Sequence, residues 1–148
     1  MKERTIDYIL RTTWLAVQKM YNEEAAKFET TMATGFTLLS IDPEKGTPST
    51  ALGPKMGMEA TSLSRILKTM EQKGLIERKP NPDDGRGVII HLTEFGHEKR
   101  AYSKERVVIF NEAIKKNVSE EKLKHFYEVS DVIGDMICNK KIYNQNDK

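Results

Sequence analysis

Residues 52–96, LGPKMGMEATSLSRILKTMEQKGLIERKPNPDDGRGVIIHLTEFG, contain the pattern that decides the fold. Apolar side chains recur there at steps of three and four residues, which predicts a helix over 59–73 with one buried face. The apolar stripe consists of Leu63, Ile66, Leu67 and Met70. Gly74 is a natural end for this helix. Two strand-like segments follow, LIERK at 75–79 and VIIHLT at 88–93, and predict two strands joined as a hairpin.

The segment between the two predicted strands, NPDDGRG at 81–87, consists mostly of turn-forming residues. We therefore expect a hairpin loop of roughly seven residues, which is looser than the two-residue type. Arg86 would lie at the loop tip, where a side chain buries little surface and contributes little stability. Its guanidinium suits a narrow DNA minor groove, where the negative potential is enhanced, and Asp84 would hold the loop or the guanidinium in position. An ordinary solvated turn is the alternative.

The predicted helix before the hairpin carries small hydroxyls and long cations outside its apolar stripe. Thr61, Ser62 and Ser64 are small enough to allow a close approach to DNA. Arg65 and Lys68 are long enough to reach phosphates or base edges. The alternative is an ordinary surface helix, because such helices carry the same residue types.

Long amphipathic helices are expected on both sides of this segment. Their ranges are 5–28, 94–117 and 119–138. Thr93 and Ser119 are suitable caps for the starts of the last two helices. The polar residues 139–148 are expected to form a frayed tail.

Two shorter helices are expected between residue 28 and the quoted stretch. Thr30 and Thr31 can cap the first of them, and Pro48 suits the first position of the second. Gly53 and Pro54 fall inside the second helix, where proline costs about 3 kcal/mol or forces a kink. The expected fold class is mainly α with a small β-hairpin wing (α+β), that is, a helix-turn-helix followed by a wing.

The overall composition limits the classes of protein to which this chain can belong. The 148 residues fit one domain or one domain plus an attached oligomerisation element, and 24 basic against 22 acidic residues leave a net charge of only +2. Any affinity for nucleic acid must therefore come from the local placement of charge. The only cysteine is Cys138, which excludes an intrachain disulfide. The first ten residues lack a signal-peptide core, and no apolar run approaches the roughly 20 residues that span a bilayer, so we expect a cytoplasmic protein without a membrane partner.

The quoted stretch resembles the winged helix-turn-helix of the multiple-antibiotic-resistance regulator (MarR) family of bacterial transcription factors. The features that match in order and spacing are Met56-Gly57, Ser64-Arg65, EQKGLIERKPNPDD at 71–84, Asp84-x-Arg86 and Leu92-Thr93-x-x-Gly96. The flanking helices agree more loosely. The resemblance implies one MarR-like domain over residues 1–148. Its winged helix-turn-helix would span 31–93, and its dimerisation helices would span 5–28 and 94–138.

Carried over by position, the resemblance implies that the helix over 59–73 lies in the DNA major groove. The residues that would face DNA are Thr61, Ser62, Ser64, Arg65 and Lys68 on this helix, Lys55 on the preceding helix and Arg86 on the wing, which Asp84 would orient. Three departures from the family pattern matter. Glu59 stands in place of a serine-like cap, and its acid would repel phosphate. Gly53-Pro54 interrupts the preceding helix, which leaves the role of Lys55 open, and Gly85 replaces a commonly basic wing residue.

The terminal helices carry more apolar residues than a small winged domain can cover. We expect the apolar faces of these helices to pack against the same helices of a second copy across a two-fold axis, which gives an isologous interface. The alternative is a six-helix monomer that folds these helices back on itself. In the dimer the helices over 59–73 of the two copies would act as recognition helices. At a separation of roughly 34–36 Å they would match a pseudopalindromic operator on double-stranded DNA.

We therefore expect a homodimeric, sequence-specific DNA-binding transcriptional regulator, and in particular a repressor. The alternative is a winged-helix protein-interaction module without specific DNA binding, which the modest net charge favours. The resemblance also implies release from DNA by a small lipophilic or aromatic ligand. The candidate pocket residues are Trp14, Met32, Phe36 and Tyr102, although aromatic and methionine residues at helical spacing also fit an ordinary core.

Other kinds of site are not expected. His91, His97 and His125 have no metal-ligand spacing with one another or with Cys138, so we expect no metal. No glycine-rich phosphate loop, nucleophile elbow or paired-carboxylate pattern occurs in the sequence, so we expect neither a cofactor nor an enzyme. Cys138 ends an apolar helical stripe without a second thiol nearby. A buried structural cysteine is therefore favoured over an oxidant sensor.

Overall fold

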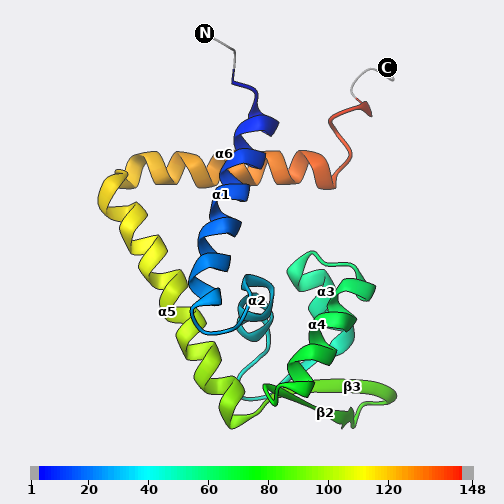
Figure 1. The fold of residues 1–148 in the computed structure, drawn as a ribbon. Coiled ribbons are helices and arrows are strands. Elements are labelled where there is room, and N and C mark those ends of the chain that lie inside the picture. The colour runs from blue at the N-terminus through cyan, green and yellow to red at the C-terminus, as the bar shows by residue number, and fades with distance from the viewer. Residues whose placement is uncertain (1–3, 145–148) are drawn as a thin grey trace. The chain divides into compact units, whose positions relative to one another are not determined.

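The computed structural model describes residues 4–144, which form six helices and three short strands (Figure 1). The elements are α1 (Ile6–Ala26), α2 (Met32–Ser40), β1 (Thr47–Pro48), α3 (Ser49–Met56), α4 (Ala60–Gln72), β2 (Ile76–Asn81), β3 (Asp84–Leu92), α5 (Glu94–Asn117) and α6 (Glu120–Cys138). The chain divides within α5 into two compact units, one up to Glu105 and one from Arg106. The predicted mainly α fold with a β-hairpin wing is confirmed.

The first unit has an apolar core formed by α2, α3, α4, the sheet and the loops next to them. The buried core residues are Leu38, Ile41, Leu52, Leu63, Leu67, Met70, Leu75, Ile76, Ile90 and Leu92. From the predicted stripe of α4, Leu63, Leu67 and Met70 are buried and Ile66 packs against the core. This burial confirms the predicted inner face of α4 and leaves the polar faces of the helix exposed.

The sheet is antiparallel with the strand order β1-β3-β2. Ile76 on β2 pairs with Leu92 on β3, and Thr47 on β1 pairs with Ile90 on β3. Strand β1 was not predicted, because we expected Thr47-Pro48 to begin a helix. Pro48 cannot donate a backbone hydrogen bond and is therefore suited to an edge strand.

A tight turn after α2 sets the position of β1. Asp42 Oδ1 accepts hydrogen bonds from the backbone N–H groups of Glu44 and Lys45, each at 2.9 Å. The buried Thr47 accepts a hydrogen bond from the Asp42 N–H through Oγ1 at 2.8 Å. The hydrogen bonds from the backbone N–H groups of Lys45 and Glu44 to the carboxylate hold the pKa of Asp42 below its usual value.

Helix α3 continues through Pro54, so the predicted interruption of this helix is wrong. Pro54 lies near the end of the eight-residue helix, and the carbonyl that loses its partner belongs to Thr50. Thr50 is exposed, so water can satisfy that carbonyl. The helix ends at Gly57, which has a left-handed φ of 64°.

The junction between the sheet and α5 is closely packed. Thr93 Oγ1 accepts a hydrogen bond from the Gly96 N–H at 3.0 Å, which confirms Thr93 as the cap of α5. The Thr93 hydroxyl also donates to the carbonyl of Gly74, and its N–H donates to the carbonyl of Leu75. A Cβ at Gly96 would lie 2.0 Å from the Leu75 carbonyl oxygen, so only glycine fits there.

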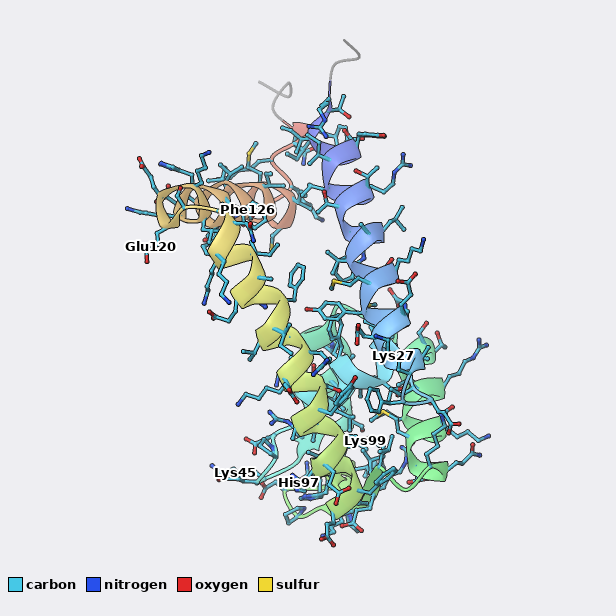
Figure 2. All side chains as sticks on the ribbon, turned by 60° about the vertical axis from the view of Figure 1, so that its left-hand side comes forward. Lys27, Lys45, His97, Lys99, Glu120 and Phe126 are labelled. Carbon is cyan, nitrogen blue, oxygen red and sulfur yellow. The ribbon has the colours of Figure 1, made fainter. Side chains whose placement is uncertain are left out.

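The second unit consists of the later part of α5 followed by α6, with several large apolar side chains exposed. Ser119 caps α6 by accepting a hydrogen bond from the Lys122 N–H at 3.3 Å, which confirms the predicted start of that helix. No residue of α6 is buried, and Phe126 is exposed on it (Figure 2). Of the predicted frayed tail, 139–144 continue as turns and a short helical step, and 145–148 lie outside the described residues.

In the part of the chain that the structure describes, no helix combines the length and apolar character needed to cross a membrane.

Candidate nucleic-acid interface

Helix α4 presents every polar residue predicted to face DNA at its surface. The exposed residues are Thr61, Ser62, Ser64, Arg65 and Lys68. Within residues 4–144 neither Arg65 nor Lys68 forms an ion pair, so both cations remain available to an external anion. The face opposite the core therefore offers small hydroxyls and unneutralised charge together.

The start of α4 lacks a side-chain cap, as the sequence predicted. Glu59 occupies the cap position with extended backbone angles, and its side chain accepts no hydrogen bond from the helix. The turn that precedes it is closed by the Met58 N–H, which donates to the Gly53 carbonyl at 2.9 Å. A Cβ at Gly53 would lie 3.1 Å from the Met58 carbonyl oxygen, so this glycine allows the close approach of α3 to the turn. The free N–H groups at this helix start remain donors for an anion.

The wing is tighter than predicted. Only Pro82 and Asp83 separate β2 from β3, so the expected seven-residue loop is wrong. Asn81 Oδ1 accepts a hydrogen bond from the Asp83 N–H at 3.0 Å and thereby closes the turn with its own side chain. The pairing then jumps from Asn81↔Asp84 to Pro80↔Val88. Three residues of β3, 85–87, consequently face no partner on β2 and form a bulge.

Arg86 occupies the middle of this bulge and is exposed. Asp84 Oδ1 accepts a hydrogen bond from the Arg86 N–H at 3.1 Å, so the carboxylate fixes the backbone on which the arginine is carried. A Cβ at Gly87 would lie 3.1 Å from Asp84 Oδ2, which shows that Gly87 leaves room for that carboxylate. The Arg86 guanidinium has no ion-pair partner in the described part of the chain.

Lys55 is exposed on α3, but its ammonium already has a partner. Lys55 Nζ donates a hydrogen bond to the Ser40 carbonyl oxygen at 2.7 Å, at the C-terminal end of α2. A cation stabilises that end of a helix, because the last carbonyls carry partial negative charge. Lys55 therefore joins α3 to α2.

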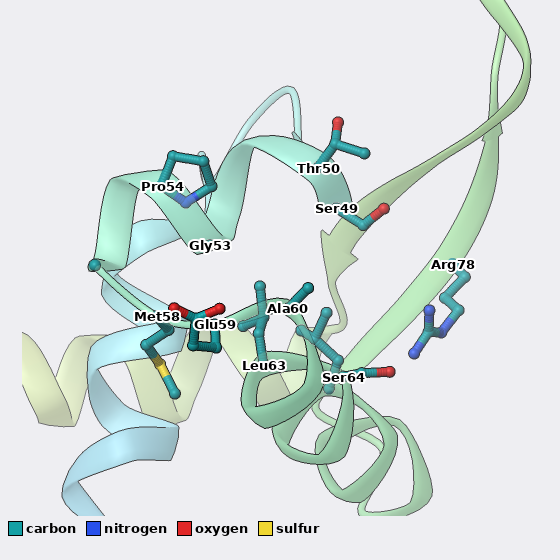
Figure 3. A pocket seen from close by; sticks show the side chains of 12 residues that line it. Ser49, Thr50, Gly53, Pro54, Met58, Glu59, Ala60, Leu63, Ser64 and Arg78 are labelled. Carbon is teal, nitrogen blue, oxygen red and sulfur yellow. The ribbon is translucent and has the colours of Figure 1, made fainter.

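A hollow of about 640 Å³ lies between α3, α4 and β2 (Figure 3). Ser49 and Thr50 from α3, Ser64 from α4 and Arg78 from β2 contribute polar side chains to its lining. Arg78 Nε is 3.1 Å from Glu71 Oε2, so its charge is partly neutralised. The sequence analysis did not single out Ser49, Thr50 or Arg78. Arg78 lies two residues after the buried Ile76 and therefore on the same face of β2, so strand alternation could not have indicated that Arg78 is exposed.

The predicted effector residues divide between two hollows. Trp14, Met32 and Phe36 line a hollow of about 600 Å³ that Lys55 also lines. Tyr102 lines another hollow, of about 400 Å³. The ring of Tyr21 contacts the ring of Phe36 edge-on, with 5.6 Å between the ring centroids. Burial raises the pKa of the Tyr21 hydroxyl above its usual value.

Cys138 is exposed at the end of α6, so the prediction of a buried cysteine is wrong. The apolar stripe that suggested burial belongs to a helix with no buried residue in this protomer. No group of three or more His, Cys, Asp or Glu side chains within 4–144 could hold a metal ion.

Comparison with known proteins is consistent with this architecture. The model of the MarR family matches residues 30–88. HTH-type transcriptional regulator YdgJ of Bacillus subtilis (strain 168) is 31% identical over 78 residues, which are 53% of this chain and 48% of the relative. The organic hydroperoxide resistance transcriptional regulator of the same organism is 30% identical over 94 residues, 64% of either chain. The chain thus spans about half to two thirds of the length of these relatives.

The same fold occurs among solved structures. The crystal structure of the Staphylococcus aureus MepR–DNA complex superposes with a TM-score of 0.81 over 90% of this chain and 99% of that chain, at 20% sequence identity. At that identity the likeness concerns the fold, and it extends beyond the winged segment to most of the chain.

Proposed function

We propose that this chain is a MarR-family transcriptional regulator that binds double-stranded DNA as a homodimer, because the family model matches residues 30–88 and the relatives that it resembles are transcriptional regulators. One observation carries the proposal. Arg65, Lys68 and Arg86 are exposed on a recognition-type helix and its wing, and none of them has an ion-pair partner among the described residues. Unneutralised cations on such elements suit the phosphates and grooves of a duplex.

In the proposed complex α4 enters the major groove. Ser64 and Thr61 approach the base edges, and Arg65 and Lys68 contact bases or phosphates. Arg86 enters the adjacent minor groove, and the Asp84 hydrogen bond to its backbone limits the directions in which the arginine can point. Lys55 keeps its bond to Ser40 and contributes a phosphate contact only if that bond opens.

The homodimer is supported by apolar surface that the protomer leaves uncovered. Neither α1 nor α6 contains a buried residue. The apolar side chains that are at least half exposed on these helices are Ile6, Tyr8, Leu15, Phe126, Tyr127, Val129, Val132 and Ile137. Such a surface is unfavourable in water and is typical of an interface between copies. Sedimentation equilibrium should give twice the 17.0 kDa protomer mass, and a single-protomer mass would contradict the proposal.

The effector site proposed for the regulator is the hollow lined by Trp14, Met32 and Phe36, which suits a small lipophilic or aromatic ligand. Lys55 lines the same hollow and ties α3 to α2 through Ser40. A ligand that attracts the Lys55 ammonium would loosen that tie and shift the population away from the DNA-binding arrangement. The regulator would thus act as a repressor that its ligand releases.

A gel-shift titration with promoter fragments from the host genome, at two salt concentrations, tests the DNA-binding proposal. Arg86→Ala should weaken operator binding by about 1–3 kcal/mol, and Lys68→Ala should reduce the salt slope by about one. Lys116→Ala on α5 removes the same charge from an exposed residue outside the proposed DNA-binding set and serves as the matched control. Binding that is independent of salt and of Arg86 would instead favour a winged-helix module that contacts protein.

A further inference from the structure

One ion pair joins the recognition-type helix α4 to the wing. Arg78 Nε on β2 donates a hydrogen bond to Glu71 Oε2 on α4 at 3.1 Å. Among residues 4–144 this is the only hydrogen bond or ion pair between a side chain of α4 and a side chain of either wing strand. Figure 3 shows the Arg78 side chain directed from β2 toward α4. The functions proposed above give this pair no role.

The pair contributes little to the stability of the fold. The side chains of Arg78 and Glu71 are 37% and 45% exposed, so water and salt screen their attraction. Exposed pairs of this kind change a folding equilibrium by about fivefold or less. Glu71 also lies in the last turn of α4, where the free carbonyls carry partial negative charge and disfavour an acid. Stability alone therefore does not explain an acid at this position.

Arg78 lies where the wing leaves the core. Ile76, two residues earlier on the same face of β2, is buried in that core. Arg78 itself pairs with Ile90 on β3, whose side chain has 0% exposure. On α4, Glu71 follows the buried Leu67 by one turn, and Leu67 lines the same hollow as Arg78. The ion pair is thus the outermost side-chain link between the wing and α4 in the described part of the chain.

Beyond Arg78 the wing has fewer strand hydrogen bonds. Pro80, which pairs with Val88, has no N–H to donate, and residues 85–87 face no partner on β2. Arg86 lies in that bulge, and the three residues of β2 after Arg78 correspond to about 10 Å of strand. A swing of about 10° at Arg78 would therefore move the tip by about 2 Å, roughly a third of the width of a DNA minor groove.

We propose that Glu71 is a positioning residue for DNA binding. By holding Arg78 it fixes the angle between α4 and the wing, and therefore the place at which Arg86 meets the duplex. The inference rests on the proposed function, in which α4 and Arg86 enter adjacent grooves. Both can engage at once only when the angle between them matches the duplex, and a protein that holds this angle beforehand loses less free energy on ordering. Glu71 acts through Arg78 and makes no contact of its own with DNA.

A double-mutant cycle tests the proposal, by fluorescence anisotropy of a labelled promoter fragment that the wild-type protein binds, at one fixed salt concentration. The variants are Glu71→Gln, Arg86→Ala and the two combined. Glu77→Gln is the matched control, because the Glu77 side chain is 51% exposed and pairs at 3.3 Å with Lys79 of the same strand. It removes the same charge near the wing and leaves the link between α4 and β2 intact.

Glu71→Gln should bind the fragment about twofold to fivefold more weakly than Glu77→Gln. In the Arg86→Ala background this difference should disappear, because Glu71 acts only through the placement of Arg86. Residues that act independently would instead give the same ratio in both backgrounds. A merely structural role of Glu71 would also leave that ratio unchanged.

Urea unfolding accompanies each titration, and the midpoints of Glu71→Gln and Glu77→Gln should agree. A clearly lower midpoint for Glu71→Gln would identify the pair as a stability element and would overturn the inference. Equal affinities of these two variants, or a ratio that persists without Arg86, would overturn it as well and leave the proposed regulator standing. Binding by the wild type that depends neither on salt nor on Arg86 would overturn the proposed function, and this inference with it.

Discussion

Gly96 provides a direct test of how the wing and α5 are joined. In Gly96→Ala the new Cβ would lie 2.0 Å from the Leu75 carbonyl oxygen and 3.0 Å from the carbonyl carbon. Ordinary contact begins near 3.4 Å, so the two backbones must separate by about 1.4 Å. The Thr93 N–H is 3.1 Å from the same Leu75 oxygen, and a shift of that size would break this hydrogen bond. The Thr93 hydroxyl bond to Gly74 would be lost with it.

The loss in the free energy of unfolding caused by Gly96→Ala can be worked out from these contacts. Each lost hydrogen bond is worth about 0.5–1.5 kcal/mol, and overpacking against backbone costs about 1–3 kcal/mol. Alanine has a higher helix propensity than glycine, which offsets about 0.5–1 kcal/mol of this loss in the free energy of unfolding. The free energy of unfolding should therefore fall by about 1–5 kcal/mol.

Urea unfolding followed by circular dichroism, at one fixed protein concentration, measures this change as a lower midpoint. Gly85→Ala is the control, because its new Cβ meets nothing within 4 Å, and it should stay within about 0.5 kcal/mol of the wild type. A midpoint for Gly96→Ala equal to that of the control would refute the close approach of α5 to Leu75.

Three further predictions concern the cap, the turn and the core. Glu59→Ser supplies the cap that α4 lacks, so it should raise the free energy of unfolding by about 0.5–1 kcal/mol and tighten DNA binding; an unchanged urea midpoint would contradict this. The pKa of Asp42 should titrate below its usual value by NMR. The stability that Asp42 adds should therefore be complete above the usual pKa and disappear as the pH falls through the lower, folded-state pKa, so the loss in Asp42→Asn should be present at neutral pH and vanish in acid. Met70→Ala removes a side chain with 0% exposure and should cost about 2–5 kcal/mol by urea unfolding.

The helices and their ends were largely predictable because their signals are local. The stripe from Leu63 to Met70 has helical spacing and is buried or packed against the core. Gly74 takes the left-handed φ of 74° expected for a residue that ends a helix. The predicted cap at Thr31 accepts its hydrogen bond from the Thr34 N–H. Each of these features depends on a few neighbouring residues, so the sequence determines them directly.

The predictions from the sequence were wrong where the local structure depends on contacts with residues that are distant in the chain. Strand β1 exists because Thr47 and Pro48 meet β3, which a two-residue segment cannot signal. The length of the wing loop depends on pairing register and on a bulge, and neither is visible in the alternation of residues. Cys138 was expected to be buried from the apolar stripe of its helix, but that stripe cannot show what the helix packs against, and Cys138 is exposed on α6, which has no buried residue. The single-domain organisation and the DNA-contacting roles of the site residues remain predictions.

The bulge in β3 has a consequence for how such a wing can change. Residues 85–87 contribute no pairing to β2, whereas Thr47 and Arg78 both pair with Ile90 further down the strand. Strand pairing therefore holds the base of the wing, whereas the tip is held by local bonds such as the one from the Arg86 N–H to Asp84 Oδ1. Amide protons near Ile90 should consequently exchange with solvent more slowly than those at the tip. If the wing contacts DNA as proposed, substitutions at residues 85–87 would alter the preferred DNA sequence without disturbing the strand pairs at the base of the wing, so sequence preference and stability would be able to evolve separately in this segment.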